Sequence, residues 1–325
     1  MNIETSLHRI KEIKSERFQT ITPEPETFKD DRLKLKKDKS YSIINTSIIN
    51  GISSFENKPI QIQLSSPSSE IPTFGFQNKK LPLIPSLTIK GQHNIQLGEI
   101  KIIEHPISVM TALNVNMDLT LSEASFPTFD YCNKPYIDAL ENNLKETGDA
   151  KFFTVKQPFA GVFEKGYFII EPDEGQKSLL VDHQVSYPGT SIGNSRIQVE
   201  ISPEFYTFLC DARTPAFRPK EETKKNFEIV KNKLIKDYPI TTENVLFVDE
   251  DTIYNPRTKF DFNGINHEFM MHELIDIIAF LKFVDVKYSG KFVGRLTTFL
   301  FDHHKQIDAA NFMCSDEMEK IGILF

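Results

Sequence analysis

The sequence predicts an α+β protein in which strands and helices form two similar blocks. Three observations support this fold class. Apolar and polar side chains alternate over residues 60–64, which is typical of a half-buried strand. Over residues 269–280 apolar side chains instead recur every three or four positions, which is typical of a largely buried helix. After a break near residues 147–150, a similar order of strands followed by helices begins again.

The first 40 residues are rich in Lys and Glu and end in a run of charged side chains. Residues 4–18 could form a polar helix, but little in this segment could bury a core. We therefore expect residues 1–40 to be a charged N-terminal extension that lies outside the folded domains.

Two domains are expected to follow, at residues 41–147 and 148–325. In the first, the pattern predicts strands at 60–64, 87–90, 95–103 and 119–123, and helices at 106–113 and 135–144. In the second, it predicts strands at 152–158, 162–171, 179–187, 196–201 and 245–248. The predicted helices of this second domain are 203–210, an amphipathic one at 220–236, 269–280 and 298–313.

Composition and charge limit the classes of partner and the location. The chain of 325 residues is 39% hydrophobic and 26% charged with a net charge of -7, so no broad basic surface for nucleic acid is expected. Its three cysteines lie far apart, which predicts a reducing compartment without disulfides. No signal segment is visible, and the longest apolar run, 274–283, is too short to span a bilayer. We expect a cytoplasmic monomer without stable membrane insertion.

The predicted helix at 269–280 carries two polar side chains that need partners. His272 and Asp276 stand four residues apart and therefore share one face of the helix, one turn from each other. A metal ion would satisfy both side chains. Alternatively, the two side chains bond to each other or to neighbouring backbone. The nearby His267-Glu268 resembles the start of a metalloprotease motif, but its histidine lies five residues before His272, on another face of the helix.

Three further stretches carry polar side chains that a solvent-exposed surface does not explain. They are Glu104-His105 after an apolar strand, the turn at 212–217, and Asp302-His303-His304. Two histidines, one aspartate and an open fourth position are a common composition for catalytic zinc. Such a site also needs a base, often Glu, and a donor for the oxyanion. Taken alone, Glu104-His105 is also explained as a capping or surface pair.

Five motifs in order give the chain a resemblance to a known family. They are Ile102-Ile-Glu-His105, Ala212-Arg-Thr-Pro-Ala-Phe217, Glu268-Phe-Met-Met-His-Glu-Leu-Ile-Asp276, Gly290-Lys-Phe292 and Asp302-His-His-Lys-Gln306. Together they resemble LpxC, the UDP-3-O-acyl-N-acetylglucosamine deacetylase family, over roughly residues 40–315. The resemblance implies two α+β domains, each a layered sandwich with helices between sheets, and an active site between the domains.

The resemblance also implies roles for individual residues. His105, His272 and Asp276 match the zinc ligands of the family, so the implied cofactor is Zn²⁺. Glu104 matches the general base, Thr214 the hydroxyl that helps to bind the oxyanion, and Phe217 an aromatic that lies against the substrate. His303, with His304 as the alternative, matches a cationic histidine near the leaving amine. An insert near 218–254 matches a passage for an acyl chain.

Three positions differ from the family pattern. Glu273 stands where the family has a Lys that contacts a substrate phosphate. Phe280 stands where the family has an Asp that steadies the cationic histidine, and Asp302 could take over that role. The family's Gly-Leu-His turn is replaced by residues 51–55, Gly-Ile-Ser-Ser-Phe, which lack the His.

The sequence therefore favours zinc-dependent deacetylation of UDP-3-O-acyl-N-acetylglucosamine in lipid A biosynthesis. Its expected partner is a small molecule, the acylated sugar nucleotide. One alternative is a zinc amidohydrolase of the same fold that acts on another N-acyl substrate, with Glu273 excluding a diphosphate. The other is a non-catalytic binding or regulatory homologue, which the missing Asp at position 280 would favour.

Overall fold

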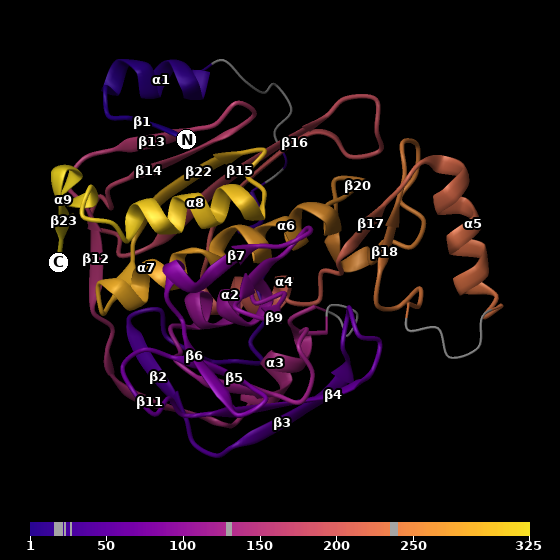
Figure 1. Ribbon diagram of the computed structural model, residues 1–325. Helices are drawn as coiled ribbons and strands as arrows, with labels where there is room; N and C mark the ends of the chain where they lie inside the picture. The colour runs from indigo at the N-terminus through magenta and orange to yellow at the C-terminus, as the bar shows by residue number, and fades with distance from the viewer. Residues whose placement is uncertain (16–21, 23, 27, 128–131, 235–239) are drawn as a thin grey trace.

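The computed structural model of the chain describes residues 1–15, 22, 24–26, 28–127, 132–234 and 240–325 (Figure 1). Parts of two predicted helices, at 16–18 and 235–236, lie outside these residues. The rest of the chain forms helices and several sheets, so the prediction of a mixed α+β protein is confirmed. Among the described residues, no helix combines the length and the apolar character needed to cross a membrane.

The larger main sheet belongs mostly to the second half of the chain. Its strands, in spatial order, are β1 (Asn2–Glu4), β13 (Phe159–Val162), β14 (Tyr167–Glu171), β22 (Gly294–Phe299), β15 (Leu179–Tyr187) and β16 (Gly193–Glu200). The neighbours β15 and β22 run parallel, and the other pairs run antiparallel. Strand β15 has the bounds that the sequence predicts.

The smaller main sheet belongs to the first half. Its strands, in spatial order, are β3 (Ser47–Ile52), β4 (Pro59–Ser65), β10 (Asp118–Leu121), β5 (Thr73–Phe76) and β6 (Lys79–Pro82). The alternation that predicts β4 is confirmed, because Ile60, Ile62 and Leu64 are buried while the residues between them are exposed.

A layer of helices lies between the two main sheets (Figure 1). Its members are α2 (Glu104–Leu113), α6 (Glu268–Ala279), α7 (Leu281–Lys287) and α8 (His303–Met313), with α3 (Lys134–Leu140) and α4 (Pro203–Leu209) beside them. Every residue of α2 is buried, and α2 packs against α6. Buried apolar side chains from both halves form one contiguous core around these helices. The two helices that carry the predicted metal ligands are therefore neighbours at the centre of the molecule.

The remaining strands are short and form small sheets outside the two main ones. Three small sheets pair β2 (Lys39–Ile43) with β11 (Leu144–Asp149), β12 (Phe152–Val155) with β21 (Lys291–Phe292) and β23 (Ile323–Leu324), and β7 (Thr88–Lys90) with β8 (Ile95–Leu97) and β9 (Ile100–Lys101). A hairpin joins β19 (Asp261–Phe262) to β20 (Ile265–Asn266). Short helical turns occur at η1 (Pro85–Leu87), η2 (Thr258–Phe260) and α9 (Met318–Ile321).

The segment predicted as an insert projects from the side of the molecule (Figure 1). It contains α5 (Lys220–Lys231) and β18 (Leu246–Val248), which pairs in parallel with β17 (Pro215–Phe217). Helix α5 is held to this small sheet by Phe227, whose ring packs edge-to-face on Phe247.

The N-terminal segment is packed more closely than the sequence predicts. Strand β1 pairs with β13, with Ile3 opposite Gly161. Helix α1 (Leu7–Ser15) buries Ile10 against the sheet, and farther along Phe28 and Leu33 join the main core. The expectation that little in residues 1–40 could bury a core is wrong for these side chains, because single apolar residues at irregular spacing give no periodic pattern to detect.

Several predicted boundaries were also wrong: residues 162–171 contain the turn between β13 and β14, and the helix expected at 135–144 ends at Leu140. Three further differences have a physical reason. Residues 95–103 form the hairpin of β8 and β9 instead of one strand, because Gly98 turns the chain with a φ of 58°. The break expected near 147–150 falls partly within β11, which continues to Asp149. The last long helix begins at His303 instead of residue 298, because the Asp302 side chain caps it by accepting the Lys305 N–H.

Candidate functional site

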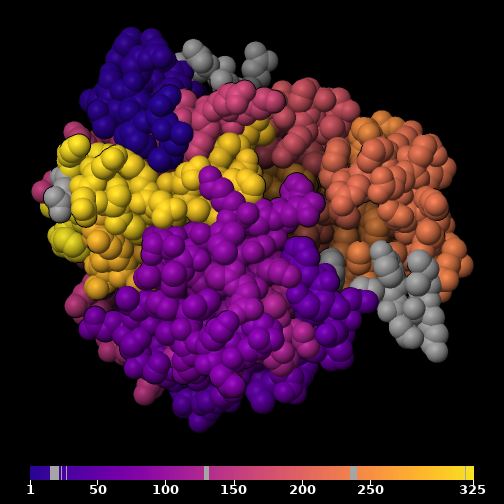
Figure 2. Space-filling model, in the orientation of Figure 1, coloured from indigo at the N-terminus to yellow at the C-terminus, as the bar shows by residue number. Residues whose placement is uncertain are grey.

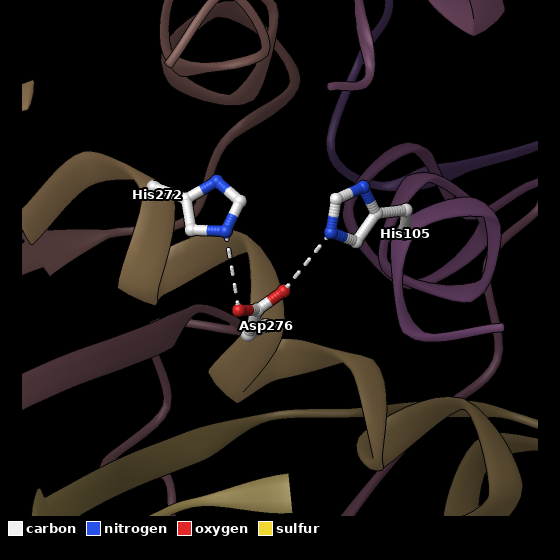
Figure 3. A group of neighbouring side chains, drawn as sticks. All are labelled: His105, His272 and Asp276. Atoms are coloured by element: carbon white, nitrogen blue, oxygen red, sulfur yellow. Dashed lines mark ion pairs between the residues drawn. The ribbon is translucent and has the colours of Figure 1, made fainter. Parts of the chain in front are cut away.

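Three side chains from the helix layer converge on one point (Figure 3). His105 is the second residue of α2, and His272 and Asp276 lie one turn apart on α6. The His272 Nε2 atom is 3.4 Å from one oxygen of Asp276, and the His105 Nε2 atom is 3.5 Å from the other. Potential ligand atoms from all three side chains lie within 4.8 Å of one another. The structure therefore brings together the three residues that the sequence predicts as metal ligands.

The spacing of these atoms suits a metal better than a hydrogen-bonded trio. Separations of 3.4 and 3.5 Å are longer than an ordinary N–H···O hydrogen bond. Two ligands held ~2.0–2.1 Å from a tetrahedral zinc ion lie about 3.3 Å apart, which is close to the separations found here. The side chains are buried, and Asp276 Oδ1 and His105 Nδ1 have no hydrogen-bond partner among the described residues. The nitrogen and oxygen donors thus fit a divalent zinc-like ion.

The charge of Asp276 is favoured by its surroundings. Burial opposes the ionised carboxyl, but His272 and His105 beside it hold the pKa of Asp276 well below its usual range. The same interaction raises the pKa of His272 above its ordinary value despite burial. An ionised carboxylate is the form that coordinates a metal ion.

A second carboxyl and a third histidine flank this group. Glu104 is the first residue of α2, where its Oε2 accepts the Ile95 N–H at 3.0 Å. Its Oε1 lies 4.0 Å from His303 Nε2, which is also 3.9 Å from Asp276 Oδ2. Burial raises the pKa of Glu104; the pKa of His303 is also raised, because nearby carboxylates outweigh burial. Ile102, just before these residues, has an unusual φ of 65°, and strain of this kind occurs at functional sites.

The two adjacent histidines of α8 have different surroundings. His303 lines the same cavity as the metal-ligand group, whereas His304 Nε2 lies 2.8 Å from the carbonyl oxygen of Gly91. Asp302 does not take the role of partner to His303 that the sequence suggested. Its carboxylate instead caps α8 and pairs with Lys305 Nζ at 2.6 Å. That expectation was wrong, because the residue just before a helix start is well placed to accept backbone N–H groups.

A cavity of about 700 Å³ opens onto these residues. In Figure 2 the surface is hollowed where the first half of the chain, in purple, meets the orange segment that contains β17 and β18. Thr214 and Phe217 line the cavity together with Glu104. Its wall also has an apolar part, made by Tyr187, Ile192, Ile240, Val245 and Phe269. All seven predicted site residues lie around this one cavity.

Glu273 on α6 and Phe280 just after it, the two positions that differ from the family pattern, have opposite environments. Glu273 lines the cavity, with its Oε2 3.9 Å from Nε2 of the buried His183, and burial raises the pKa of Glu273 to about 7. Phe280 is fully buried and packs edge-to-face on Phe301, with ring centroids 5.5 Å apart. Position 280 is therefore part of the core, whereas position 273 adds an acid to the cavity wall.

Two groups of contacting residues near the site were not predicted from the sequence. Arg213 Nε lies 2.6 Å from Glu268 Oε1, and both side chains are almost fully buried. Cys132 lies 3.5 Å from His272 Nδ1, and Asn133 donates to the His105 carbonyl. A signal existed for Glu268, which is one turn before His272 within an apolar helix, but no regular spacing marks Cys132.

The chain is similar to proteins of one known family. The family model described as "LpxC: UDP-3-O-acyl N-acetylglycosamine deacetylase" matches residues 42–306, a range that contains every residue of the candidate site. The UDP-3-O-acyl-N-acetylglucosamine deacetylase of Lawsonia intracellularis is 23% identical over 216 residues, which cover 63% of each chain. The protein of that name from Nitratidesulfovibrio vulgaris is 19% identical over 196 residues, 59% of this chain and 58% of that one. The chain thus spans about three-fifths of the length of these curated relatives.

Proposed function

The chain belongs to the LpxC family of UDP-3-O-acyl-N-acetylglycosamine deacetylases, and we propose that it removes the N-acetyl group from UDP-3-O-acyl-N-acetylglucosamine in lipid A biosynthesis. The observation that carries this proposal is the convergence of His105, His272 and Asp276 in a cavity that also contains Glu104. A buried ligand group beside a buried carboxyl is the arrangement that metal-assisted hydrolysis of an amide needs.

The proposed cofactor is Zn²⁺, held by His105, His272 and Asp276. When bound, it would polarise the amide carbonyl and lower the pKa of the attacking water. The two Nε2 atoms and the carboxylate of Asp276 face a common point, so these side chains need little rearrangement to act as ligands. Burial of the group limits competition from bulk solvent.

Glu104 is the proposed general base. Its Oε2 is fixed by the Ile95 N–H, and its Oε1 faces His303 across 4.0 Å. A raised pKa suits a carboxyl that accepts a proton from the attacking water. His303, with its raised pKa, carries positive charge next to the amide and donates a proton to the leaving amine.

Thr214 and Phe217 complete the proposed substrate site. The Thr214 hydroxyl donates a hydrogen bond to the oxyanion, and the Phe217 ring lies against the substrate. Both residues line the cavity next to Glu104. The apolar part of the cavity wall and the insert at 218–254 are the proposed passage for the acyl chain, because apolar side chains from this segment, including Val245, face the cavity.

We also propose a domain organisation, a location in the cell and an oligomeric state. Each half of the chain contributes one main sheet and at least one of the central helices, which supports two domains with the site between them. We also propose that each half is a layered sandwich with helices between sheets. The packing of α2, from the first half, against α6, from the second, is the contact expected between two such domains. All three cysteines are free, which supports the proposed cytoplasmic location. The proposed oligomeric state is a monomer, and the proposed partner is a small-molecule substrate.

A second candidate substrate is favoured by Glu273. This acid lines the cavity at a position where it repels a phosphate group, and Arg218 is the one Lys or Arg among the described lining residues. An N-acyl amino sugar without a diphosphate would avoid that repulsion. The reaction and the proposed roles of the chain's residues would be unchanged.

One assay separates these candidates. Acetate release is measured from UDP-3-O-acyl-N-acetylglucosamine and from the same acylated sugar without UDP, with protein stripped by a chelator and then restored with Zn²⁺. We expect zinc-restored release from the UDP-linked compound. Release from the simpler sugar alone would favour the second candidate. Release from neither compound by zinc-loaded protein would contradict both and favour a non-catalytic homologue.

A further inference from the structure

Cys132 contacts a predicted metal ligand from the side opposite the proposed metal. The thiol is 1% exposed, and its Sγ lies 3.5 Å from His272 Nδ1 and 3.4 Å from Thr214 Oγ1. The other ring nitrogen of His272, Nε2, faces Asp276. A histidine that binds metal through Nε2 carries a proton on Nδ1 and donates it to a nearby acceptor. Among the described residues, the acceptors next to Nδ1 are the Cys132 sulfur and the Ala212 carbonyl, also at 3.5 Å.

The next residue, Asn133, contacts the helix that carries the other histidine ligand. Its side chain is fully buried, and its Nδ2 donates to the His105 carbonyl and to Ser108 Oγ, each at 3.0 Å. Ser108 in turn donates to the His105 carbonyl at 2.7 Å and shares a hydrogen bond with Tyr206. This network fixes the first turn of α2, where His105 lies.

The backbone of the dipeptide adds a further observation. Cys132 has a φ of 54°, a left-handed conformation that a residue with a side chain seldom adopts. Such conformations persist where surrounding contacts hold them, and they occur often at functional sites. Here the Asn133 N–H donates to the Cys210 carbonyl at 3.2 Å, so the dipeptide is held from a third side.

We propose that Cys132-Asn133 is a positioning element for the metal centre, which sets the orientation of the His272 imidazole and its distance from His105. The proposal rests on the metal centre of the proposed function. The ligands come from separate halves of the chain, and one dipeptide contacts both of them. Cys132 orients the His272 ring and restrains the Thr214 side chain, while Asn133 holds the first turn of α2. Neither residue touches the reacting atoms.

The test measures metal binding by three single variants. Cys132→Ala removes the sulfur and leaves the Ala212 carbonyl as the acceptor for Nδ1, while Cys132→Ser keeps a smaller acceptor. Cys210→Ala is the matched control, because Cys210 is equally buried but bonds to the Thr207 carbonyl, away from the ligands. Zn²⁺ affinity is measured by competition with a chromophoric chelator. Ligand geometry is followed by the visible spectrum of the Co²⁺-substituted protein, and folding by circular dichroism.

We expect Cys132→Ala to bind Zn²⁺ roughly tenfold more weakly or worse, the range typical for losing an outer partner of a metal ligand, and to alter the cobalt spectrum. The Zn²⁺ affinity of Cys132→Ser should lie between those of Cys132→Ala and the wild type. The affinity and the cobalt spectrum of Cys210→Ala should match those of the wild type. Wild-type affinity and spectrum in folded Cys132→Ala would overturn the proposal. If that variant does not fold, Asn133→Ala, which removes the contacts of the dipeptide with the His105 carbonyl and Ser108, is measured instead, and a wild-type result for it would do the same. A sulfur-to-cobalt charge-transfer band would also overturn it, because Cys132 would then be a ligand.

The metal-binding measurements are independent of the deacetylase assay, because they contain no sugar substrate. Weaker zinc binding by Cys132→Ala in a protein that releases no acetate would support the positioning role and contradict the proposed reaction. Normal zinc binding by Cys132→Ala in an active enzyme would contradict the positioning role alone. A wild-type chain that binds no Zn²⁺ would contradict both.

Discussion

The carboxylate of Glu104 is fixed at one oxygen and open at the other. Its Oε2 accepts the Ile95 N–H, whereas its Oε1 faces His303 and the metal-ligand group. Because the side chain is almost fully buried, its orientation is set by the fold and not by solvent. A residue held in this way can accept a proton without first losing rotamer freedom.

Replacing Glu104 with Gln should separate proton transfer from metal binding. The amide keeps the shape of the side chain but cannot accept a proton from water. We expect the turnover rate of Glu104→Gln to fall roughly 10²–10⁴-fold, the contribution typical of a general base. Zinc content, measured by elemental analysis, should stay at the wild-type level. A variant with the wild-type rate would show that another residue is the base.

At the scale of elements, the buried pair of Arg213 and Glu268 joins a loop to a helix. Arg213 directly precedes Thr214, and Glu268 lies one turn before His272 on α6. The Arg213 side chain makes two hydrogen bonds to Glu268, of 2.6 and 2.8 Å, and its backbone N–H makes a third, of 3.2 Å. The guanidinium also donates to the carbonyls of Thr242 and Asn255. The pair thus ties the loop of Thr214, the insert and the ligand-bearing helix together.

Glu268→Gln should destabilise the fold strongly. It leaves the Arg213 charge buried without its carboxylate partner, and breaking a buried pair in this way costs about 3–5 kcal/mol. The free energy of unfolding is measured by urea titration. Glu99→Gln, which removes the exposed partner of Lys79, is the control and should change stability by less than about 1 kcal/mol. A loss for Glu268→Gln as small as that of the control would contradict the role of the pair.

Elements could be predicted where one face of the element is buried and the other is not. Strand β4 follows this rule, and its prediction is confirmed. Strand β15, with nearly all of its residues buried on both faces, was instead predicted from the bounds of its run of strand-forming residues. The hairpin of β8 and β9 was missed because apolar residues on both sides of Gly98 read as one continuous strand. Burial of Phe28 and Leu33 was missed for a different reason, since each reaches the core through a long-range contact that local sequence does not encode.

The same distinction applies to the candidate site. The spacing of His272 and Asp276 on one helix predicts a shared face, and the structure has that arrangement. The approach of His105 depends on the packing of α2 on α6, which no local pattern contains; only the order of motifs resembling a family pointed to it. Cys132 could not be found, because its proximity to His272 arises from a loop with no periodic signal.

At the scale of the whole molecule, the helix layer also buries charge away from the site. Lys282, Asp285 and Lys291 are all at least nine-tenths buried. The Asp285 carboxylate accepts the Phe292 N–H at 2.8 Å, and Lys282 Nζ is 3.5 Å from the Val115 carbonyl. Burial lowers the pKa of Lys282 to about 8 and raises the pKa of Asp285 to about 6.

Lys282 should therefore make the free energy of unfolding depend on pH in the alkaline range. Its pKa is lower in the folded state than the ordinary value of 10.5, so between about pH 8 and 10.5 the unfolded chain binds more protons. The free energy of unfolding then gains a contribution that increases with pH over this window. Lys282→Met removes that contribution. We expect the variant to exceed the wild type in stability most at pH 7, with the difference shrinking towards pH 10. Urea titrations that give a constant difference would contradict the assignment.

One edge of the larger main sheet is formed by its short first strand, β1. Strand β1 covers the edge of β13, and Ile3 stands opposite Gly161 in the ladder. Ile3→Pro should weaken this pairing, because proline cannot donate a backbone hydrogen bond, and should expose the β13 edge to other chains. We expect more concentration-dependent association in light scattering than for Leu7→Ser, a control on the exposed face of α1. Equal scattering by both variants would show that β1 does not protect the edge.

The pairing of β1 with β13 also sets an order of events during synthesis. Residues 2–4 are synthesised before the strand to which they bind, residues 159–162, and the whole first half of the described chain lies between them. His105 on α2 is likewise synthesised before His272 and Asp276 on α6, so the three residues can come together only after α6 has emerged. The nascent first half can build its own sheet, whereas the larger main sheet and the group of His105, His272 and Asp276 can be completed only after the elements of the second half have emerged.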